Sequence, residues 1–187
     1  MRAFFALEIP PDVRHEAAAA GAELAQRVGG FRVTREENLH VTIAFLGEIA
    51  ETAAQPLAAM LADACRKRGP FSMQLGGAGW FPPRGAPSVA WIGARAGEQP
   101  AVELARAAAE IAAAAGIATD GREPHVHATI ARARGPRCDQ AALAAWKRRW
   151  DARDCGPAFE VGRVVLFESV LAPGGSVYTE RASAPLR

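Results

Sequence analysis

Two copies of a His-x-Thr pattern are the part of this sequence best suited to chemistry. The first is His40-Val-Thr42 in NLHVTIAFLG, and the second, 87 positions later, is His127-Ala-Thr129 in HVHATIARAR. Both copies are followed by Ile-Ala, and the chain has only four histidines. Because side chains on a strand alternate between its two faces, the His and Thr of each copy would share one face, about 6 to 7 Å apart. The pattern predicts two matched pairs of polar groups that reach one ligand.

Two imidazoles and two hydroxyls are suited to opening a cyclic phosphodiester. Such an ester carries its own leaving group and reacts by in-line displacement. One group must accept a proton from the attacking water, and another must donate a proton to the departing ribose oxygen from the opposite side of the phosphorus. Histidine fits both roles because its ordinary pKa of about 6.5 allows one neutral and one charged ring near neutral pH. We therefore expect His40 and His127 to be catalytic, with Thr42 and Thr129 holding the non-bridging oxygens.

The residues around both motifs alternate as they do in strands with one buried face. In segment 38–46 the residues predicted to face the core are Leu39, Val41, Ile43 and Phe45. In segment 125–131 they are Val126, Ala128 and Ile130. Both histidines therefore fall on the opposite, open face of their strand.

Further strands and helices are interspersed along the rest of the chain. Strands are predicted at 2–9, 71–75, 88–93, 159–167 and 177–182, and helices at 12–28, 51–68, 98–115 and 139–150, the first capped by Asp12. The segment GGAGWFPPRGAP, residues 76–87, is rich in glycine and proline and predicts a long loop. No linker divides the chain, so we expect one α+β domain over residues 1–187, built from two related lobes.

The composition excludes several classes of protein. With 187 residues, of which 50% are hydrophobic and 22% charged, the chain should form one globular domain. Its net charge of +2 is too small for a protein that coats nucleic acid through phosphates alone, so any RNA contact would be local. Three cysteines without C-x-x-C spacing indicate neither a disulfide framework nor a cysteine zinc site. We expect a cytoplasmic protein with no membrane segment.

The two motifs resemble those of the 2H phosphoesterase superfamily. The sequence around them is similar to the RNA 2′,3′-cyclic phosphodiesterases, historically called 2′-5′ RNA ligases, in the blocks RAFFALEIP, NLHVTIAFLG, WFPPRGAPSVAWIG and HATIAR. The resemblance implies a bilobal fold in which two antiparallel sheets line a central cleft and helices pack outside. In this fold the His-x-Thr strands are related by a pseudo-two-fold axis and face each other across the cleft.

The same resemblance implies an activity. It implies hydrolysis of a terminal 2′,3′-cyclic phosphate of RNA to a 2′-phosphate without a metal or other cofactor, with reversible 2′-5′ RNA ligation as a further expectation. By this analogy His127 activates water and His40 protonates the leaving 3′ oxygen. Which histidine is the acid and which is the base stays open on the sequence alone.

Two more residues near the second motif are expected to bind substrate. Family members commonly carry proline directly before the second histidine, whereas here Pro124 precedes His125 and the threonine spacing selects His127. By parity His125 shares the face of His127, where it could touch substrate or lie at the surface. Arg132 matches an arginine that follows the second motif in the family, which implies a phosphate or ribose contact. Parity places Arg132 on the other face, so the strand would have to end or bulge before it.

Several alternatives stay open on the sequence alone. His40, His125 and His127 could form a zinc site, although no carboxylate lies at ligand spacing and both threonines would then have no purpose. A non-catalytic module that binds RNA ends is a second alternative. Within the enzyme class, the substrate could instead be tRNA splicing products, 2′-5′ linked oligonucleotides or small cyclic nucleotides. No feature indicates an obligate protein partner, so a monomer is expected.

Aromatic residues elsewhere admit two interpretations. Trp80, Phe81 and Arg84 could stack on a terminal base, although core packing of the two aromatic rings is the more usual role. The sequence WKRRW at 146–150 mixes aromatic and basic residues on one predicted helix. We expect that helix to bury its tryptophans and expose its charges.

Overall fold

The computed structural model describes residues 1–119, 123–135, 137–173 and 175–187. The strands are β1 (Arg2–Glu8), β2 (Phe31–Val33), β3 (His40–Glu48), β4 (Phe71–Phe81), β5 (Val89–Ala96), β6 (His127–Ala133), β7 (Phe159–Val161), β8 (Arg163–Ala172) and β9 (Gly175–Pro185). The α-helices are α1 (Pro11–Arg27), α2 (Ala54–Cys65), α3 (Glu98–Ala114) and α4 (Gln140–Asp151). Short 3-10 helices are η1 (Glu36–Asn38) and η2 (Glu51–Ala53).

All strand pairs are antiparallel, and the strands form one continuous curled sheet. Its order is β7-β4-β5-β6-β3-β1-β8-β9, with β2 paired to β6. The two halves meet where β3 pairs with β6, through the single residue pair Val41–Ala128. The predicted α+β fold is confirmed, and the sheets of the two lobes join at the motif strands.

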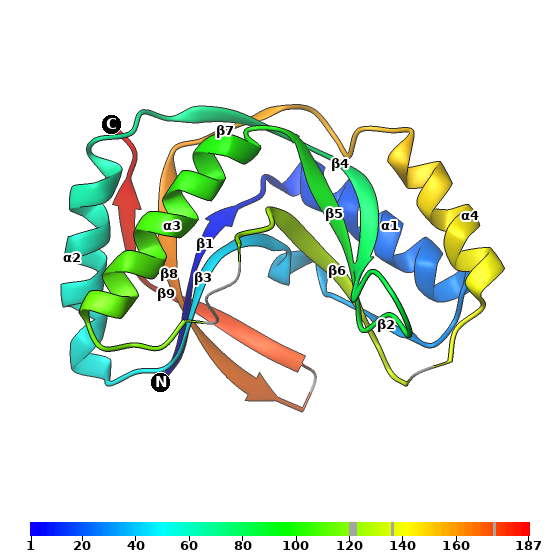
Figure 1. Ribbon diagram of the computed structural model, residues 1–187, viewed down its shortest axis with the longest axis horizontal. Helices are drawn as coiled ribbons and strands as arrows, with labels where there is room; N and C mark the ends of the chain where they lie inside the picture. Colours follow the sequence, from blue (N-terminus) through cyan, green and yellow to red (C-terminus); the bar gives the residue numbers. More distant parts are fainter. Residues whose placement is uncertain (120–122, 136, 174) are drawn as a thin grey trace.

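The helices cover the two halves of the sheet in pairs. Helices α2 and α3 lie together at one end of the molecule, and α1 and α4 lie together at the other (Figure 1). Helix α1 follows β1 of one half but packs on β6 of the other, while α3 follows β5 and packs on β3. Each half therefore receives a helix from the other half, which ties the two halves together.

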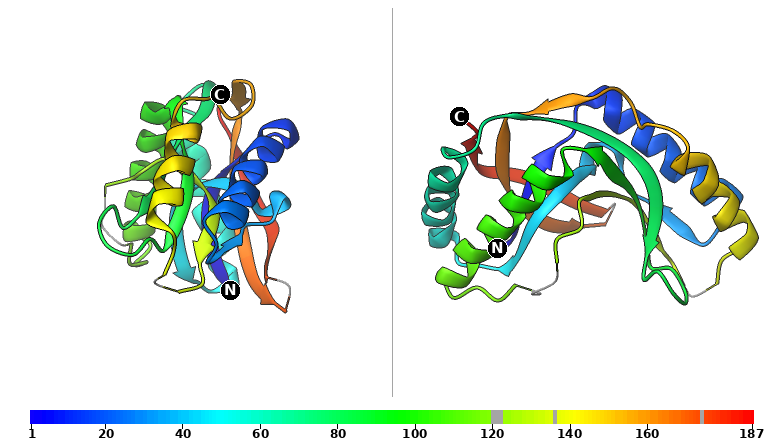
Figure 2. Two further views of the ribbon diagram at one scale, coloured as in Figure 1. Left: turned by 90° about the vertical axis from the view of Figure 1, so that its right-hand side faces the viewer. Right: turned by 45° about the horizontal axis from the view of Figure 1, so that its top comes forward.

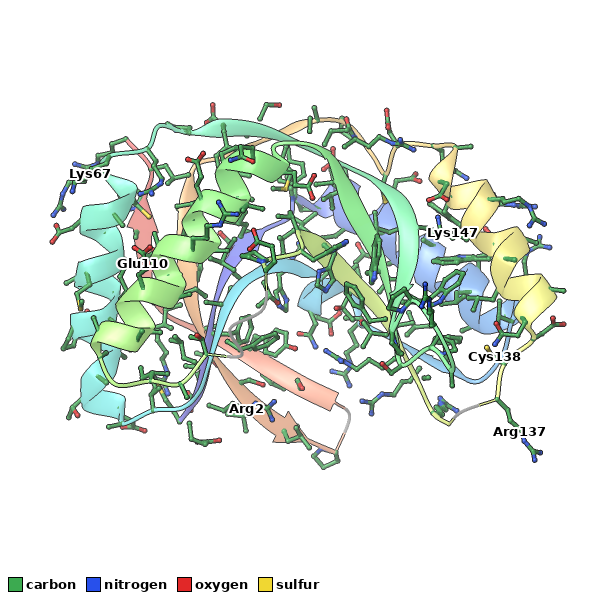
Figure 3. All side chains as sticks on the ribbon, viewed as in Figure 1. Arg2, Lys67, Glu110, Arg137, Cys138 and Lys147 are labelled. Atoms are coloured by element: carbon green, nitrogen blue, oxygen red, sulfur yellow. The ribbon has the colours of Figure 1, made fainter. Side chains whose placement is uncertain are left out.

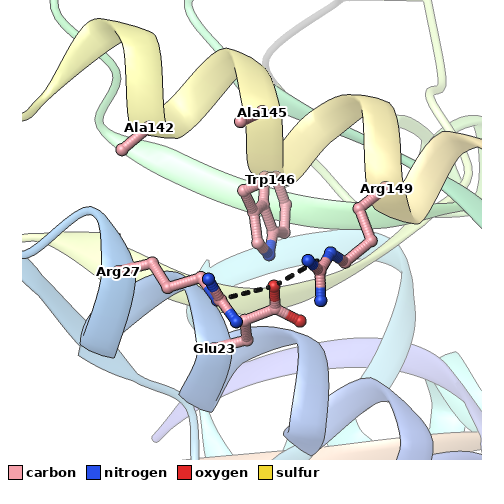
Figure 4. Close-up of a pocket in the computed structure, with 6 residues that line it drawn as sticks. All are labelled: Glu23, Arg27, Ala142, Ala145, Trp146 and Arg149. Carbon is pink, nitrogen blue, oxygen red and sulfur yellow. Dashed lines mark ion pairs between the residues drawn. The ribbon is translucent and has the colours of Figure 1, made fainter.

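Helix α4 packs on α1 through the tryptophans of the WKRRW segment. Trp146 is buried, and its indole N–H donates to the carbonyl oxygen of Ala20 at 3.0 Å. The carboxylate of Glu23 lies between the guanidinium groups of Arg27 and Arg149, at 3.1 and 3.4 Å (Figure 4). The expected burial of the tryptophans, with the charges at the surface, is confirmed.

The prediction of a long loop at residues 76–87 is wrong for its first half, which belongs to strand β4. The strand continues through the glycines to Phe81, which leaves only 82–88 as a loop. Glycine is required there because Trp91 of β5 lies across the neighbouring strand. A Cβ atom on Gly79 would come within 2.2 Å of the Trp91 ring. Glycine in this strand therefore marks a close side-chain approach rather than a turn.

The predicted strand at 159–167 is two strands. Strand β7 pairs with β4 at one edge of the sheet, whereas β8 pairs with β1 and β9 near the other edge. Only Gly162 separates them, so the curl of the sheet brings its two edge regions close together (Figure 2). A period-two pattern cannot show this change of partner.

Two smaller expectations are also corrected. Pro10 is the N-cap of α1, and Asp12 lies inside the first turn, where its carboxylate accepts from the N–H of Val13 at 2.9 Å. Phe45 does not face the core, because 59% of its surface is exposed.

Charged side chains point outward at both ends of the molecule. The exposed Lys67 and Arg137 project away from the body at opposite ends (Figure 3). Among the described residues, no helix has the length and apolar character needed to cross a membrane.

Candidate active site

The two His-x-Thr motifs lie side by side at the junction of β3 and β6. Val41 pairs with Ala128 in antiparallel register, so His40 and Thr42 flank this pair along β3, and His127 and Thr129 flank it along β6. Val41 and Ala128 are fully buried, and the four motif side chains occupy the other, half-open face. The two histidines lie close enough for the charge of His127 to act on the pKa of His40.

Each imidazole is held by the backbone carbonyl two residues before it. Nδ1 of His40 lies 2.8 Å from the carbonyl oxygen of Asn38, and Nδ1 of His127 lies 2.6 Å from that of His125. A carbonyl only accepts, so Nδ1 carries the hydrogen in both rings and Nε2 of the neutral ring is unprotonated. In the first motif the hydroxyl of Thr42 donates to Nε2 of His40 at 3.0 Å. Both rings therefore keep Nε2 as the nitrogen able to exchange protons.

A β-bulge follows the threonine of each motif. Along β3 the register with β1 skips Ile43, and along β6 the register with β5 skips Ile130. A bulge adds one residue and reverses the face of the residues after it. The carbonyl of Ile130 accepts from the N–H of Thr34 at 2.8 Å, and α1 passes so close that a Cβ atom on Gly21 would lie 2.8 Å from the same oxygen.

The bulges place the fifth residue after each histidine on the open face. In the second motif this residue is Arg132, so the bulge that its proposed role required is present. In the first motif it is Phe45, which pairs with Phe4 of β1. Sequence alternation alone assigned Phe45 to the core because it could not reveal the bulge.

Aromatic rings surround His40. The Phe4 ring stacks on its imidazole, with ring centres 4.8 Å apart, and the Tyr178 ring approaches edge-on at 5.3 Å. Neither residue was predicted from the sequence to belong to the site. Phe4 was part of an apolar strand, and only register reveals that it faces the histidine. Tyr178 is the single tyrosine of the chain, which was the one available signal.

A second aromatic group surrounds His127. Phe81 approaches the His127 ring edge-on at 5.3 Å and the His125 ring at 5.1 Å. Trp91 lies 4.6 Å from the His125 ring. Phe81 and Trp91 are both half-buried, so these rings fix the position of the histidines while keeping part of their surface open. Trp80 instead packs against the core, and Arg84 is exposed in the 82–88 loop.

The electrostatic surroundings keep both histidines neutral in the free protein. Burial, together with the charges of His127 and Arg132, lowers the pKa of His40 to about 4, although its bond to the Asn38 carbonyl acts in the opposite direction. Burial also lowers the pKa of His127, as do the charges of His125 and Arg132. The Arg132 guanidinium therefore acts on both imidazoles.

The structure thus brings together five of the six residues selected from sequence, and His125 sits beside them. His40, Thr42, His127 and Thr129 share one face, and Arg132 joins them through the bulge. His125 precedes β6 and is exposed, with its carbonyl holding His127. In the part of the chain that the structure describes, no three His, Cys, Asp or Glu side chains are arranged to hold a metal ion.

Both halves of the chain match the same model of a known protein family. The model of the LigT-like phosphoesterases matches residues 7–91 and 95–178, and each matched stretch contains one His-x-Thr motif. The chain belongs to the LigT-like phosphoesterase family. Membership agrees with the paired strands at the β3–β6 junction and identifies the protein as an enzyme of the phosphoesterase class.

Members of the LigT-like family with curated names align with most of the chain. A protein of Archaeoglobus fulgidus is 29% identical over 180 residues, which cover 96% of this chain and 97% of the relative. An Escherichia coli K12 protein is 33% identical over 132 residues, which cover 70% of this chain and 71% of the relative. Both are named RNA 2′,3′-cyclic phosphodiesterase.

Solved LigT-like structures share the fold over nearly the full length. The protein TT0787 of Thermus thermophilus has a TM-score of 0.81 at 26% identity, covering 100% of this chain and 98% of TT0787. E. coli LigT in complex with 3′-AMP has a TM-score of 0.76 at 25% identity, covering 99% of this chain and 97% of LigT. The curled sheet with its helix pairs is therefore the fold of this family.

Proposed function

We propose that this protein hydrolyses the 2′,3′-cyclic phosphate at an RNA end to a 2′-phosphate. The observation that carries the proposal is the pair of imidazoles, each fixed through Nδ1 to a backbone carbonyl and each flanked by a threonine hydroxyl on one open face. The names of the curated relatives supply the substrate class. The geometry supports the reaction type, because Nε2 of His40 and Nε2 of His127 could each transfer a proton in a reaction at one phosphorus.

The reaction requires two coordinated proton transfers. The water oxygen forms a bond to phosphorus while the bond from phosphorus to the 3′ oxygen breaks. Nε2 of His127 takes the proton from water, and Nε2 of His40 gives its proton to the 3′ oxygen. The products are a 2′-phosphate and a free 3′ hydroxyl. In joining, a 5′ hydroxyl would replace water as the nucleophile and the two roles would be the same, whereas cleavage of a 2′-5′ linkage back to the cyclic phosphate would exchange them.

The bound phosphate itself supplies the charge that His40 needs. In the free protein His40 is neutral near neutral pH, because its pKa is about 4. A phosphodiester anion beside the ring favours the imidazolium form and raises this pKa. The hydroxyls of Thr42 and Thr129, with the guanidinium of Arg132, are suited to the non-bridging oxygens, where negative charge is concentrated.

No step in this mechanism needs a metal ion, so we propose that the enzyme works without one. The three-histidine zinc alternative lacks a suitable ligand set, because no three His, Cys, Asp or Glu side chains of the described residues are arranged to hold a metal ion. In addition, Nε2 of His40 already accepts from the Thr42 hydroxyl. We further propose that the protein acts as a cytoplasmic monomer.

Incubation with a short oligoribonucleotide ending in a 2′,3′-cyclic phosphate, in excess EDTA, tests this function. We expect complete conversion to a product whose terminal phosphate is on the 2′ oxygen, as identified by digestion and chromatography. Dependence on added zinc, or a 3′-phosphate product, would reject the proposal. If the protein cleaves 2′-5′ linked oligonucleotides but does not open the cyclic phosphate, the alternative substrate class is correct and the proposal is wrong.

A further inference from the structure

Beside Arg132, the short strand β2 places a second arginine on the open face. The register pairs Arg32 of β2 directly with Arg132 of β6. Directly paired residues point to the same side of a sheet, with Cβ atoms about 4.5 to 5.5 Å apart. Because the Ile130 bulge turns Arg132 to the face of the histidines, Arg32 must lie on that face as well. Both side chains are exposed.

This pair is costly unless an anion is bound. Like charges directly opposite each other on adjacent strands destabilise a sheet. Among the residues that the structure describes, no carboxylate lies within 4.0 Å of either guanidinium group, whereas Arg163, Arg106 and Arg95 elsewhere each have an acidic partner. An anion that bridges Arg32 and Arg132 would remove the repulsion.

The two arginines lie at different distances from the catalytic histidines. Arg132 lowers the pKa of both catalytic histidines, so its charge lies within reach of the reacting phosphorus. Arg32 is one strand farther out, on β2, which among the described residues pairs with β6 alone. The positive charges of Arg132 and Arg32 therefore extend from the histidines on β6 outward to β2.

We propose that Arg32 binds the phosphodiester that links the terminal nucleotide to its 5′ neighbour, so that the enzyme prefers RNA oligomers to cyclic mononucleotides. The inference rests on the proposed function and specifies its substrate. A cyclic mononucleotide carries one phosphate, which the catalytic face holds. An RNA end carries further phosphates, and guanidinium groups are well suited to bind them.

A competing surface for the RNA strand would be the cavity on the other side of His40. Experiment can separate binding at this cavity from binding at the Arg32–Arg132 pair. The cavity, of about 720 Å³, has the half-buried Arg14 in its wall, together with Arg35, Arg163 and three glutamates. Arg163 is paired with Glu8 at 2.7 Å, and Arg35 lies 3.7 Å from Glu37. The balance of charge in this cavity suits a phosphodiester less well than the Arg32–Arg132 pair does.

The test compares binding of adenosine 2′-phosphate with binding of the dinucleotide ApA carrying a terminal 2′-phosphate. Calorimetric titration gives both dissociation constants for the wild type, Arg32→Gln, Arg14→Gln and Arg148→Gln, the last removing an exposed arginine on α4. We expect the wild type to bind the dinucleotide about tenfold more tightly than the mononucleotide, because a charge-assisted hydrogen bond contributes about that factor. Arg32→Gln should lose this advantage, and the other two variants should keep it.

The outcomes are distinct from those of the proposed function. An unchanged preference in Arg32→Gln, or a loss in Arg14→Gln instead, overturns the inference. So does a wild type that binds both ligands equally. These binding ratios are read without turnover, so an enzyme that binds as expected but fails to open a cyclic phosphate would contradict the proposed function alone.

Discussion

At the scale of single residues, both halves of the site repeat the same features, a His-x-Thr motif and a backbone carbonyl that holds Nδ1 of the histidine. Residue types and spacing selected both histidines and both threonines, because a strand with period two places His and Thr together whatever the fold. Arg132 was selected through the family resemblance. Sequence could not predict the carbonyls of Asn38 and His125 that hold the rings, since those depend on backbone conformation before each strand. It also missed Phe4 and Tyr178, which reach His40 only through register and tertiary packing.

The hydroxyl of Thr42 should contribute to the rate through His40. Thr42→Val removes the donor to Nε2 and an oxygen ligand while keeping the shape of the side chain. We expect kcat to fall about tenfold, the effect of losing one useful hydrogen bond. Thr42→Ser keeps the hydroxyl and should retain most activity. Equal rates for the two variants in steady-state assays would show that the hydroxyl has no role.

The pH dependence of the rate follows from the lowered histidine pKa values. The active form needs one ring protonated and one neutral, so both kcat and kcat/KM should be bell-shaped. Because both pKa values are lowered in the free protein, kcat/KM should be largest below pH 6.5. The phosphate of the bound substrate raises them, so the optimum of kcat should lie at higher pH. Profiles of initial rates measure both, and coincident optima or a monotonic profile would contradict the assignment.

At the scale of elements, the two bulges decide which residues reach the substrate. For Arg132 to bind substrate, the strand had to end or bulge before it, and the register shows a bulge at Ile130. The matching bulge at Ile43 was not predicted, and Phe45 was therefore placed on the wrong face. The glycine-rich half of β4 was interpreted as a loop because glycine is common in turns. In this strand glycine makes room for Trp91, a contact between strands that local sequence does not encode.

Gly79→Ala tests that close packing. The added methyl group would lie 2.2 Å from the Trp91 ring, so the ring must move or the strands must separate. We expect a loss of about 1 to 3 kcal/mol in unfolding free energy, as for other overpacked sites. Gly69→Ala is the matched control because a Cβ atom there meets nothing within 4 Å. Chemical denaturation measures both, and equal stability of the two variants would show that Trp91 does not require the glycine.

At the scale of the whole molecule, the helices and the curled sheet hold the two motifs together. The α+β class, the single domain and the lobe duplication were expected from the order of elements and the repeated motif. The crossing of α1 and α3 between halves was not, because periodicity identifies a helix but not the sheet on which it packs. The same limit explains the predicted strand at 159–167, which changes partner at Gly162.

Acid should destabilise the folded protein through its half-buried histidines. The pKa of His40 falls from an ordinary 6.5 to about 4 on folding, so between these values the unfolded chain takes up a proton that the folded protein does not. The contribution of a neutral His40 to stability is therefore present above pH 6.5 and is lost as the pH falls towards 4. Tm measured from pH 7 to 4.5 should fall more steeply for the wild type than for His40→Gln. Parallel curves would mean that His40 does not titrate in this way.

The most direct test of the account is the single-turnover rate on a cyclic-phosphate oligoribonucleotide for His40→Ala, His127→Ala and His15→Ala. His15 is exposed on α1 and serves as the matched control. Each proton transfer contributes roughly a hundredfold or more, so the first two variants should each lose at least that factor. The His15 variant should keep the wild-type rate. Near-normal rates in the His40 and His127 variants, with circular dichroism showing all proteins folded, would contradict the claim that these two imidazoles carry the chemistry.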